Sequence, residues 1–287
     1  MVTTQQPTVK FWGTRGSLPV SGKNHVTYGG NTSCVEIGTS RENGQFVIID
    51  AGSGLYALGE SLTARKAQNY QKNYHICLSH FHLDHLMGIP FFAPLFQSDC
   101  SVHFHTITED APDGFEPVLN RLMSDPFFPI ESNIFEADVQ YHSHASGAEI
   151  DLGDVKLTTC PIPHPGGAHA YRVQIADKNI IYATDTEHET DNLNSELVAF
   201  SQNADLMLYD CTYDDNEFED KKGFGHSTWQ EAIRLAQLAH VKNLAIYHHD
   251  PSRTDVQLDE IEKKAQLVFK NSFVAADNQL FVLDNES

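Results

Sequence analysis

The chain has 287 residues, of which 40% are apolar and 10% aromatic, a composition that allows a sizeable buried core. No apolar run approaches the roughly 20 residues of a membrane span, and residues 1–10 carry no apolar signal region, so we expect a cytoplasmic protein without membrane contact. Acidic residues outnumber basic ones by 39 to 19, and the net charge of −20 predicts that the protein does not bind long nucleic acids. The five cysteines are scattered and indicate free thiols.

Short apolar runs that end in polar residues recur along the chain. Each of five segments contains four apolar residues bounded by turn signals, which indicates strands covered on both faces. Strands mixed with helices in this order predict a layered α/β architecture with functional residues at one edge of the sheets. The predicted strands are 46–50, 74–78, 180–185, 205–210 and 244–248.

Three other segments show the periodicity of helices. The first covers 55–66, and the last covers 255–270 and is followed by a closing strand near 279–283. The middle one lies in "GHSTWQEAIRLAQLAH", where Ser227 and Thr228 each stand three residues before a Gln or Glu. Either residue therefore fits the start of a capping box.

Residues 108–147 differ from the rest of the chain in composition. From Thr108 to Asp154 there are eleven acidic residues and one basic residue, Arg121. The Pro- and Phe-rich part, 112–132, indicates an ordered loop with a short helix that forms a lid or pocket wall, or simply packs over a sheet edge. We expect one domain, 1–287, with 108–147 as an insertion.

Three histidines and an aspartate crowd into six positions directly after the strand at 74–78. In His80-x-His82-x-Asp84-His85, an extended chain points the first two imidazoles the same way. We expect Asp84 and His85 to lie at the start of a helix that Leu86 begins, facing a second point nearby. Because imidazole and carboxylate suit zinc or a similar divalent ion, this segment can serve two ions.

Further ligands must come from distant segments. His164 lies in the irregular loop "PIPHPGG", and Asp185 ends an apolar strand with a carboxylate that can bridge two ions. His248 ends another strand, but His249 follows it directly. Alternation along a strand lets only one of these two histidines point at the metals.

These motifs resemble those of the metallo-β-lactamase superfamily. The resemblance is carried by "FWGTRGS", "IIDAGSG", "LSHFHLDH", "PHPGG", "YATDT", "DCTY…GHST" and "LAIYHHDP", from about residue 10 to 252. The "CTY…GHST" arrangement resembles the branch that contains ribonuclease Z, phosphoribosyl cyclic phosphodiesterase and cyclic-nucleotide phosphodiesterases. The resemblance implies a four-layer αββα sandwich, a dinuclear site at one edge of the sheets, and a homodimer.

The resemblance also implies three ligands for each of two divalent ions, zinc or alternatively manganese, and one bridging ligand. The first ion would be held by His80, His82 and His164, the second by Asp84, His85 and His248, and both by Asp185.

Four more residues have expected roles beside the ions. Asp50 resembles an aspartate that orients a ligating imidazole. His226 matches a histidine that phosphodiesterases of this branch use near the leaving group, and Asp210 would orient it. Arg15, in the glycine-rich "GTRGS", either contacts a substrate anion or is an ordinary surface residue, since the segment lacks the spacing of a phosphate loop.

The expected activity is hydrolysis of a small phosphodiester, with a cyclic nucleotide as the preferred substrate. The ions would activate water, and His226 would protonate the leaving oxygen. A thioesterase or lactonase of the glyoxalase II kind needs no such acid. An RNA-processing nuclease is disfavoured by charge and by the lack of the long basic arm of ribonuclease Z. A non-catalytic nucleotide sensor would be favoured by missing ligands, and none is missing.

The remaining histidines have no expected metal role. Two HxH pairs lack the following Asp-His and should alternate along one half-exposed strand face; they are His103 with His105 and His142 with His144. Ordinary surface or packing positions are expected for His25, His75, His188 and His240.

Overall fold

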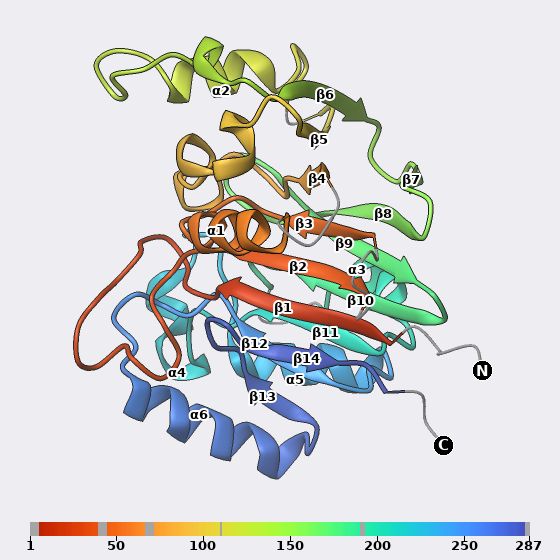
Figure 1. Ribbon diagram of the computed structural model, residues 1–287. Helices are drawn as coiled ribbons and strands as arrows, with labels where there is room; N and C mark the ends of the chain where they lie inside the picture. Colours follow the sequence, from red (N-terminus) through yellow and green to blue (C-terminus); the bar gives the residue numbers. More distant parts are fainter. Residues whose placement is uncertain (1–5, 40–44, 67–71, 110, 190–192, 285–287) are drawn as a thin grey trace.

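The computed structural model describes residues 6–39, 45–66, 72–109, 111–189 and 193–284. In these residues, two mixed β-sheets of seven strands each face one another and carry helices on their outer surfaces (Figure 1). The strand order is β14-β1-β2-β3-β4-β5-β6 in the first sheet and β13-β12-β11-β10-β9-β8-β7 in the second. The arrangement confirms the four-layer αββα sandwich.

The first sheet is antiparallel from β14 to β3 and parallel from β3 to β6. Its strands are β1 (Pro7–Gly13), β2 (Cys34–Thr39), β3 (Phe46–Ile49), β4 (Asn73–Cys77), β5 (Ser101–Ile107), β6 (Asp138–His144) and β14 (Leu280–Val282).

The second sheet is antiparallel from β7 to β10 and parallel from β10 to β13. Its strands are β7 (Ile150–Asp151), β8 (Val155–Ile162), β9 (Ala168–Ile175), β10 (Lys178–Ala183), β11 (Leu206–Asp210), β12 (Leu244–Tyr247) and β13 (Ser272–Val274).

Helices α1 and α2 pack on the first sheet, and α3, α5 and α6 pack on the second. The α-helices of the described residues are α1 (Gly54–Lys66), α2 (Glu116–Leu122), α3 (Ser195–Phe200), α4 (Asp215–Phe218), α5 (Trp229–Leu238) and α6 (Asp255–Val268). Short 3₁₀ helices are η1 (Leu83–His85), η2 (Ile89–Phe91), η3 (Ala93–Phe96), η4 (Ser132–Ile134) and η5 (Glu219–Lys221).

Among the described residues, three apolar clusters separate the four layers. Between the sheets, Ile49 of β3 and Leu208 of β11 belong to one cluster, while Leu58 of α1 packs in another on the outer face of the first sheet. In β10, Ile180 joins the cluster between the sheets and Ile181 joins the cluster under the helices. Both faces of this strand are buried, as its unbroken apolar run predicts.

The three predicted helices are present as α1, α5 and α6. Thr228 is the N-cap of α5, because its side chain accepts a hydrogen bond from the backbone N–H of Glu231. The helix expected to begin at Leu86 is a wrong prediction. Residues Leu83–His85 form only the 3₁₀ turn η1, and Pro90, without an N–H, lies in the next short turn, η2.

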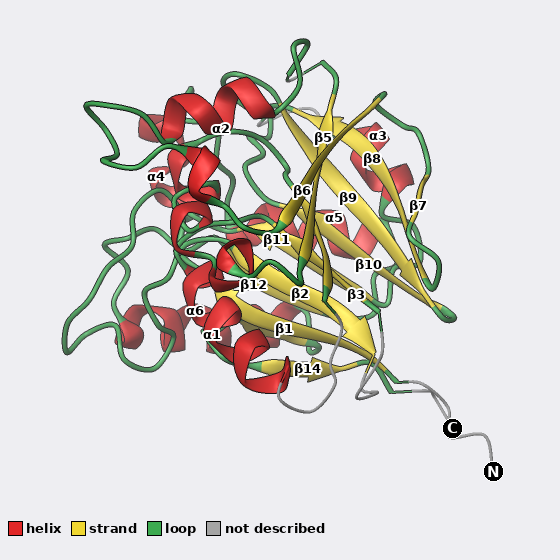
Figure 2. Cartoon of the chain, turned by 45° about the horizontal axis from the view of Figure 1, so that its top comes forward, coloured by secondary structure: helices red, strands yellow, loops and turns green. Residues whose placement is uncertain are grey.

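Residues 108–147 contribute more than a loop. They contain α2, η4 and the strand β6, which pairs with β5 and forms one edge of the first sheet. Both views place α2, β5 and β6 together at one end of the sandwich (Figures 1 and 2). No helix in the described ranges combines the length and the apolar character needed to cross a membrane.

Candidate metal centre

The centre begins where strands end in an unusual backbone conformation. Asp50 directly follows β3, Asp185 lies two residues after β10, and His248 directly follows β12. All three have positive φ, at 61°, 58° and 60°. Non-glycine residues rarely adopt this left-handed conformation, which costs of order 1–3 kcal/mol and is concentrated at functional sites. The chain therefore turns sharply at each strand end.

The first group of candidate ligands combines the two ends of the HxH motif with two distant residues. Nδ1 of His82 lies 3.0 Å from Nε2 of His164. Oδ1 of Asp185 lies 3.9 Å from Nε2 of His80 and 3.7 Å from Nε2 of His164. One ligand atom from each of these four residues lies within 4.8 Å of the others, so they can surround one cation.

The second group faces the other oxygen of the same carboxylate. Oδ2 of Asp185 lies 3.1 Å from Nε2 of His85 and 3.2 Å from Nε2 of His248. Oδ2 of Asp84 lies 3.2 Å and 3.5 Å from the same two nitrogens. The two oxygens of Asp185 thus face two separate sets of ligand atoms.

Unpaired nitrogens show that this donor set fits divalent cations. The Nε2 atoms of His80, His85 and His248 are buried and have no hydrogen-bond partner. Leaving a buried polar atom unsatisfied costs about 1–3 kcal/mol, a cost that a coordinated cation removes. Burial also lowers the pKa of His80 well below its ordinary value, so the ring is held in the neutral form that binds metal.

Hydrogen bonds behind the ligands fix their orientation. The carboxylate of Asp50 accepts from Nδ1 of His85 at 2.7 Å, and also from Ser79 and from the hydroxyl of Tyr182. Nδ1 of His164 donates to the carbonyl oxygen of Gly225 at 2.8 Å. The bonds at Nδ1 leave Nε2 of His85 and Nε2 of His164 facing the centre.

Gly225 is required by this close approach. It has φ of +87°, and a Cβ atom at this position would lie 2.3 Å from Nδ1 of His164. The glycine therefore allows the backbone carbonyl to reach the imidazole.

Asp210 and His226 form a buried pair beside the two groups. Oδ2 of Asp210 accepts from Nδ1 of His226 at 2.9 Å and from the backbone N–H of Asp185 at 2.9 Å. Although burial of the ring opposes protonation, the negative charge of Asp210 raises the pKa of His226 to about 9. Nδ1 of His226 lies 3.8 Å from Oδ1 of Asp185, so the imidazole stands next to the ligand atoms.

The structure separates His248 from His249. His249 is fully buried, and its Nε2 donates to the carbonyl of Ala275 at 2.8 Å, away from the ligand groups. Burial lowers the pKa of His249 to about 3. His248, which has the positive φ, is the one that faces Asp185.

Arg15 is not a surface residue. Its side chain is 0% exposed and donates to the backbone carbonyls of Gly29, Asp250 and Arg253. The expectation of an ordinary surface residue is wrong, because the buried guanidinium ties the loop after β1 to the loop after β12, and contact with a substrate anion stays a prediction.

Sequence reasoning missed the residues that support the ligands. Ser79 and Tyr182 both donate to Asp50, and the hydroxyl of Thr212 lies 3.2 Å from Nδ1 of His248. These residues stand within the quoted motifs "LSHFHLDH", "YATDT" and "DCTY". Their positions next to candidate ligands were the signal, but their contacts arise only from the packing of separate strands.

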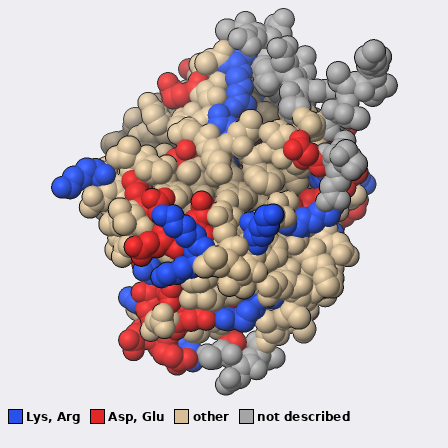
Figure 3. Space-filling model, turned by 90° about the horizontal axis from the view of Figure 1, so that it is seen from below, with Lys and Arg blue, Asp and Glu red and all other residues tan. Residues whose placement is uncertain are grey.

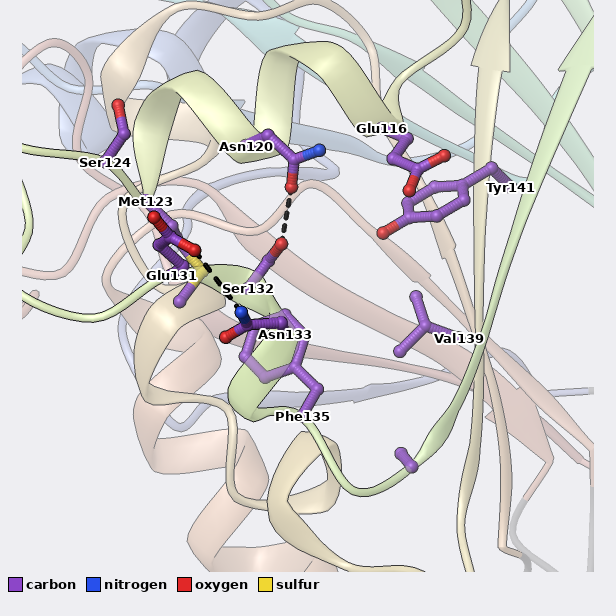
Figure 4. Close-up of a pocket in the computed structure, with 11 residues that line it drawn as sticks. Glu116, Asn120, Met123, Ser124, Glu131, Ser132, Asn133, Phe135, Val139 and Tyr141 are labelled. Carbon is purple, nitrogen blue, oxygen red and sulfur yellow. Dashed lines mark hydrogen bonds between the residues drawn. The ribbon is translucent and has the colours of Figure 1, made fainter.

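Residues 108–147 line two cavities. One, of about 600 Å³, is lined by α2, η4 and β6, with Glu116, Asn120 and Tyr141 among the side chains that point into it (Figure 4). The other, of about 530 Å³, adjoins the HxHxDH segment, since Phe81 and Leu83 form part of its wall. The role of 108–147 as a lid or pocket wall stays a prediction.

The sequence of this chain is similar to that of proteins from one known family. The family model described as beta-lactamase superfamily domain matches residues 45–249. The Ribonuclease Z of Clostridium acetobutylicum is 23% identical and aligns with 96% of this chain and 97% of its own length. The Ribonuclease Z of Lachnospira eligens is 25% identical over 93% of this chain and 94% of its own.

Solved structures with the same fold cover the whole sandwich. The metallo-beta-lactamase fold protein YhfI from Bacillus subtilis has a TM-score of 0.73 at 18% identity, over 97% of this chain and 100% of that chain. The short form of human tRNase Z has a TM-score of 0.63 at 19% identity, over 97% and 100%. The Zn²⁺-bound PqqB from Methylobacterium extorquens has a TM-score of 0.64 at 12% identity, over 96% and 99%.

The prediction that the protein does not bind long nucleic acids is wrong. Proteins named Ribonuclease Z align with nearly the whole chain, and the short form of human tRNase Z shares its fold. Net charge failed as an argument because it averages over the surface. On the face seen in Figure 3, Lys and Arg side chains lie among acidic ones, so local charge departs from the average.

Proposed function

Because the chain belongs to the beta-lactamase superfamily, we propose that it is a metal-dependent hydrolase that cleaves phosphodiester bonds with two divalent ions. Relatives named Ribonuclease Z over nearly the whole chain support this class of reaction. The observation that carries the proposal is the placement of Asp185, whose two oxygens face two separate sets of ligand atoms. A carboxylate in this position is suited to bridge two cations.

The proposed ligand assignment follows these two sets. One ion would be held by His80, His82 and His164, the other by Asp84, His85 and His248, with Asp185 shared. A donor set of imidazoles and carboxylates favours zinc, with manganese as the alternative. Zinc is also the metal of the structural neighbour PqqB.

The chain's own residues would orient the substrate and move a proton. Two divalent ions bound here supply Lewis-acid chemistry towards water and the phosphoryl group. His226, held by Asp210 and protonated because its pKa is raised, would donate its proton to the departing oxygen. This acid favours phosphodiester cleavage over the thioesterase or lactonase alternative, since an acyl substrate of that kind does not need it.

RNA processing of the ribonuclease Z type is the substrate class that the relatives favour. Several proteins with this name align with more than nine-tenths of both chains. A small cyclic nucleotide is the second candidate. It is favoured by the cavity of about 530 Å³ beside the HxHxDH motif, whose wall combines apolar side chains with the basic Arg121.

A direct comparison of substrates tests the proposal. Metal-loaded protein is assayed on a precursor transfer RNA, on a panel of cyclic nucleotides and on linear model diesters, with His82→Ala as the inactive control. We expect cleavage of at least one diester, lost in the control. Turnover of thioesters or lactones without any diester cleavage would contradict the proposal. Light scattering during gel filtration checks the predicted homodimer.

A further inference from the structure

Five histidines outside the metal centre line one face of three neighbouring strands. His75 of β4 pairs in register with His103 of β5, and His105 of β5 pairs with His142 of β6. His144 of β6 follows two residues later, on the same face as His142. We call these five residues the histidine ladder: His75, His103, His105, His142 and His144.

The ladder lies on the inner face of the first sheet, at its edge. Cys77, the register partner of His105, belongs to the apolar cluster between the sheets. Val139 and Tyr141 of β6, which line the cavity in Figure 4, therefore point to the opposite face. His105 is buried at 3% exposure, whereas the other four imidazoles are half-buried and reachable from solvent.

The imidazoles contact one another through their nitrogen atoms. Nδ1 of His103 lies 3.0 Å from Nε2 of His142. Nδ1 of His105 lies 3.0 Å from Nε2 of His144, and Nε2 of His105 lies 2.9 Å from Nδ1 of His75. Within each of these pairs one nitrogen carries a proton that the other accepts.

Burial disfavours the protonated form of four of the five imidazoles. Burial lowers the pKa of His75 to about 4 and that of His105 to about 2, and it also lowers the pKa values of His103 and His144. Neighbouring imidazoles add to the effect, since protonating one ring would place its charge against the next. Neutral imidazole is the form that coordinates transition metals.

We propose that the histidine ladder is a second metal site, which binds one divalent transition-metal ion between His103 of β5 and His142 of β6. Two nitrogens that ligate one tetrahedral ion at about 2.0–2.1 Å are separated by about 3.3 Å. The observed 3.0 Å contact needs to open by only a few tenths of an ångström when the ion replaces the shared proton. His105 and His144 make a contact of the same length, but His105 is buried at 3% exposure, so water cannot reach that pair to complete the coordination of an ion.

This site should differ from the centre at Asp185 in its affinity for metal and in the effect of a bound ion on the protein. Within the described residues, three or more ligand atoms come together only at that centre. The ladder offers ligands in pairs, so water molecules must complete the coordination of an ion bound there. We therefore expect weaker binding. Because β6 is an edge strand whose neighbour in the sheet is β5, an ion between them would fasten this edge.

Metal counting on the full protein tests the site without any activity assay. Zinc is added in excess to protein already loaded at the centre, and bound metal is measured by mass spectrometry after equilibrium dialysis. We expect one equivalent more than the centre holds. The double variant His103→Gln with His142→Gln should lose that equivalent and keep the metal of the centre, whereas His240→Gln, at an exposed histidine elsewhere, should bind as the wild type does.

Electron paramagnetic resonance identifies the ligands. A small amount of Cu²⁺ added to the zinc-loaded protein should give nitrogen couplings from imidazole in the wild type and in His240→Gln, and these should be lost in the double variant. Thermal unfolding should show that added zinc raises the melting temperature of the wild type more than that of the variant. If the double variant fails to fold, His142→Gln alone replaces it. No additional equivalent in the wild type, or the same copper spectrum in the variant, would overturn the proposal.

Discussion

The HxH spacing occurs both at the metal centre and in the histidine ladder, yet the two regions differ in their surroundings. His80 and His82 lie in the loop that leaves β4, where distant strand ends bring carboxylates to them. His103 and His105 lie inside β5, where the neighbours are other imidazoles. The same spacing therefore yields convergent sets of imidazoles and carboxylates in one place and pairs of imidazoles in the other. Position at a strand end decides the difference.

The largest effect should come from removing a histidine of the metal centre, with the loss of a histidine from the ladder as the comparison. His82→Ala removes a ligand atom of the first group, so activity on diesters should be abolished, a larger loss than the 10–100-fold typical when only a supporting partner of a ligand is removed. His103→Ala should leave this activity unchanged. Steady-state rates and metal content of both variants give the comparison. Equal losses would mean that spacing alone, and not the strand-end position, determines function.

His226→Ala should lower kcat by roughly 10² to 10⁴-fold on a natural diester, because general acid catalysis contributes that much. Metal content should stay as in the wild type, since His226 is not assigned as a ligand. The loss should shrink for p-nitrophenyl diesters, whose leaving group is stable without a proton. Loss of metal together with activity would instead place His226 among the ligands.

Asp50→Asn should weaken metal binding by about 10–100-fold while the other ligands remain. The reason is that Asp50 fixes His85 through the 2.7 Å bond to Nδ1 and does not itself belong to either ligand group. Competition with a chelator measures the affinity. Asp205→Asn, at a buried aspartate away from the centre, serves as the control. If the two variants bind metal equally well, the orientation of His85 by Asp50 contributes nothing to the free energy of metal binding.

The smallest expected effect is a shift in pH dependence. If His226 acts as the acid, it must carry its proton, so the rate falls as pH rises through its pKa of about 9. Asp210→Asn removes the negative charge that raises this pKa, and the descending limb should move to lower pH. The pH profile of kcat/KM on a natural diester shows the shift. An unmoved limb would assign it to another group.

The local parts of the fold could be predicted from the sequence. The unbroken apolar run of β10 and the cap of α5 follow from short-range patterns, and the structure contains them. The order of strands within the sheets could not be predicted in this way, because it depends on contacts between distant segments. The expected helix at Leu86 failed for a related reason. The N–H of Gly88 bonds to the carbonyl of Ala51, which draws this turn onto the loop after β3.

The centre shows the same division between local pattern and packing. Strand-end positions were enough to indicate Asp185 and His248, because the carboxyl ends of neighbouring parallel strands meet at one edge. The choice between His248 and His249 needed the backbone, since only His248 has positive φ. Arg15 was misplaced because nothing in "GTRGS" reveals that carbonyl groups surround its guanidinium. The contacts of His75 with His103 and His105 likewise depend on strand order.

The left-handed backbone at Asp50, Asp185 and His248 limits how this centre can be redesigned. Asn and Gly accept positive φ readily, whereas β-branched residues do not. In a deep mutational scan scored for folding alone, Asn and Gly should therefore be the best tolerated replacements at Asp185, and Val and Ile the worst. Scored for metal retention, none of these four replacements should survive. A replacement for a ligand at a strand end must both adopt positive φ and coordinate the metal. An engineer who seeks a new metal preference therefore has more freedom at His82 and His164.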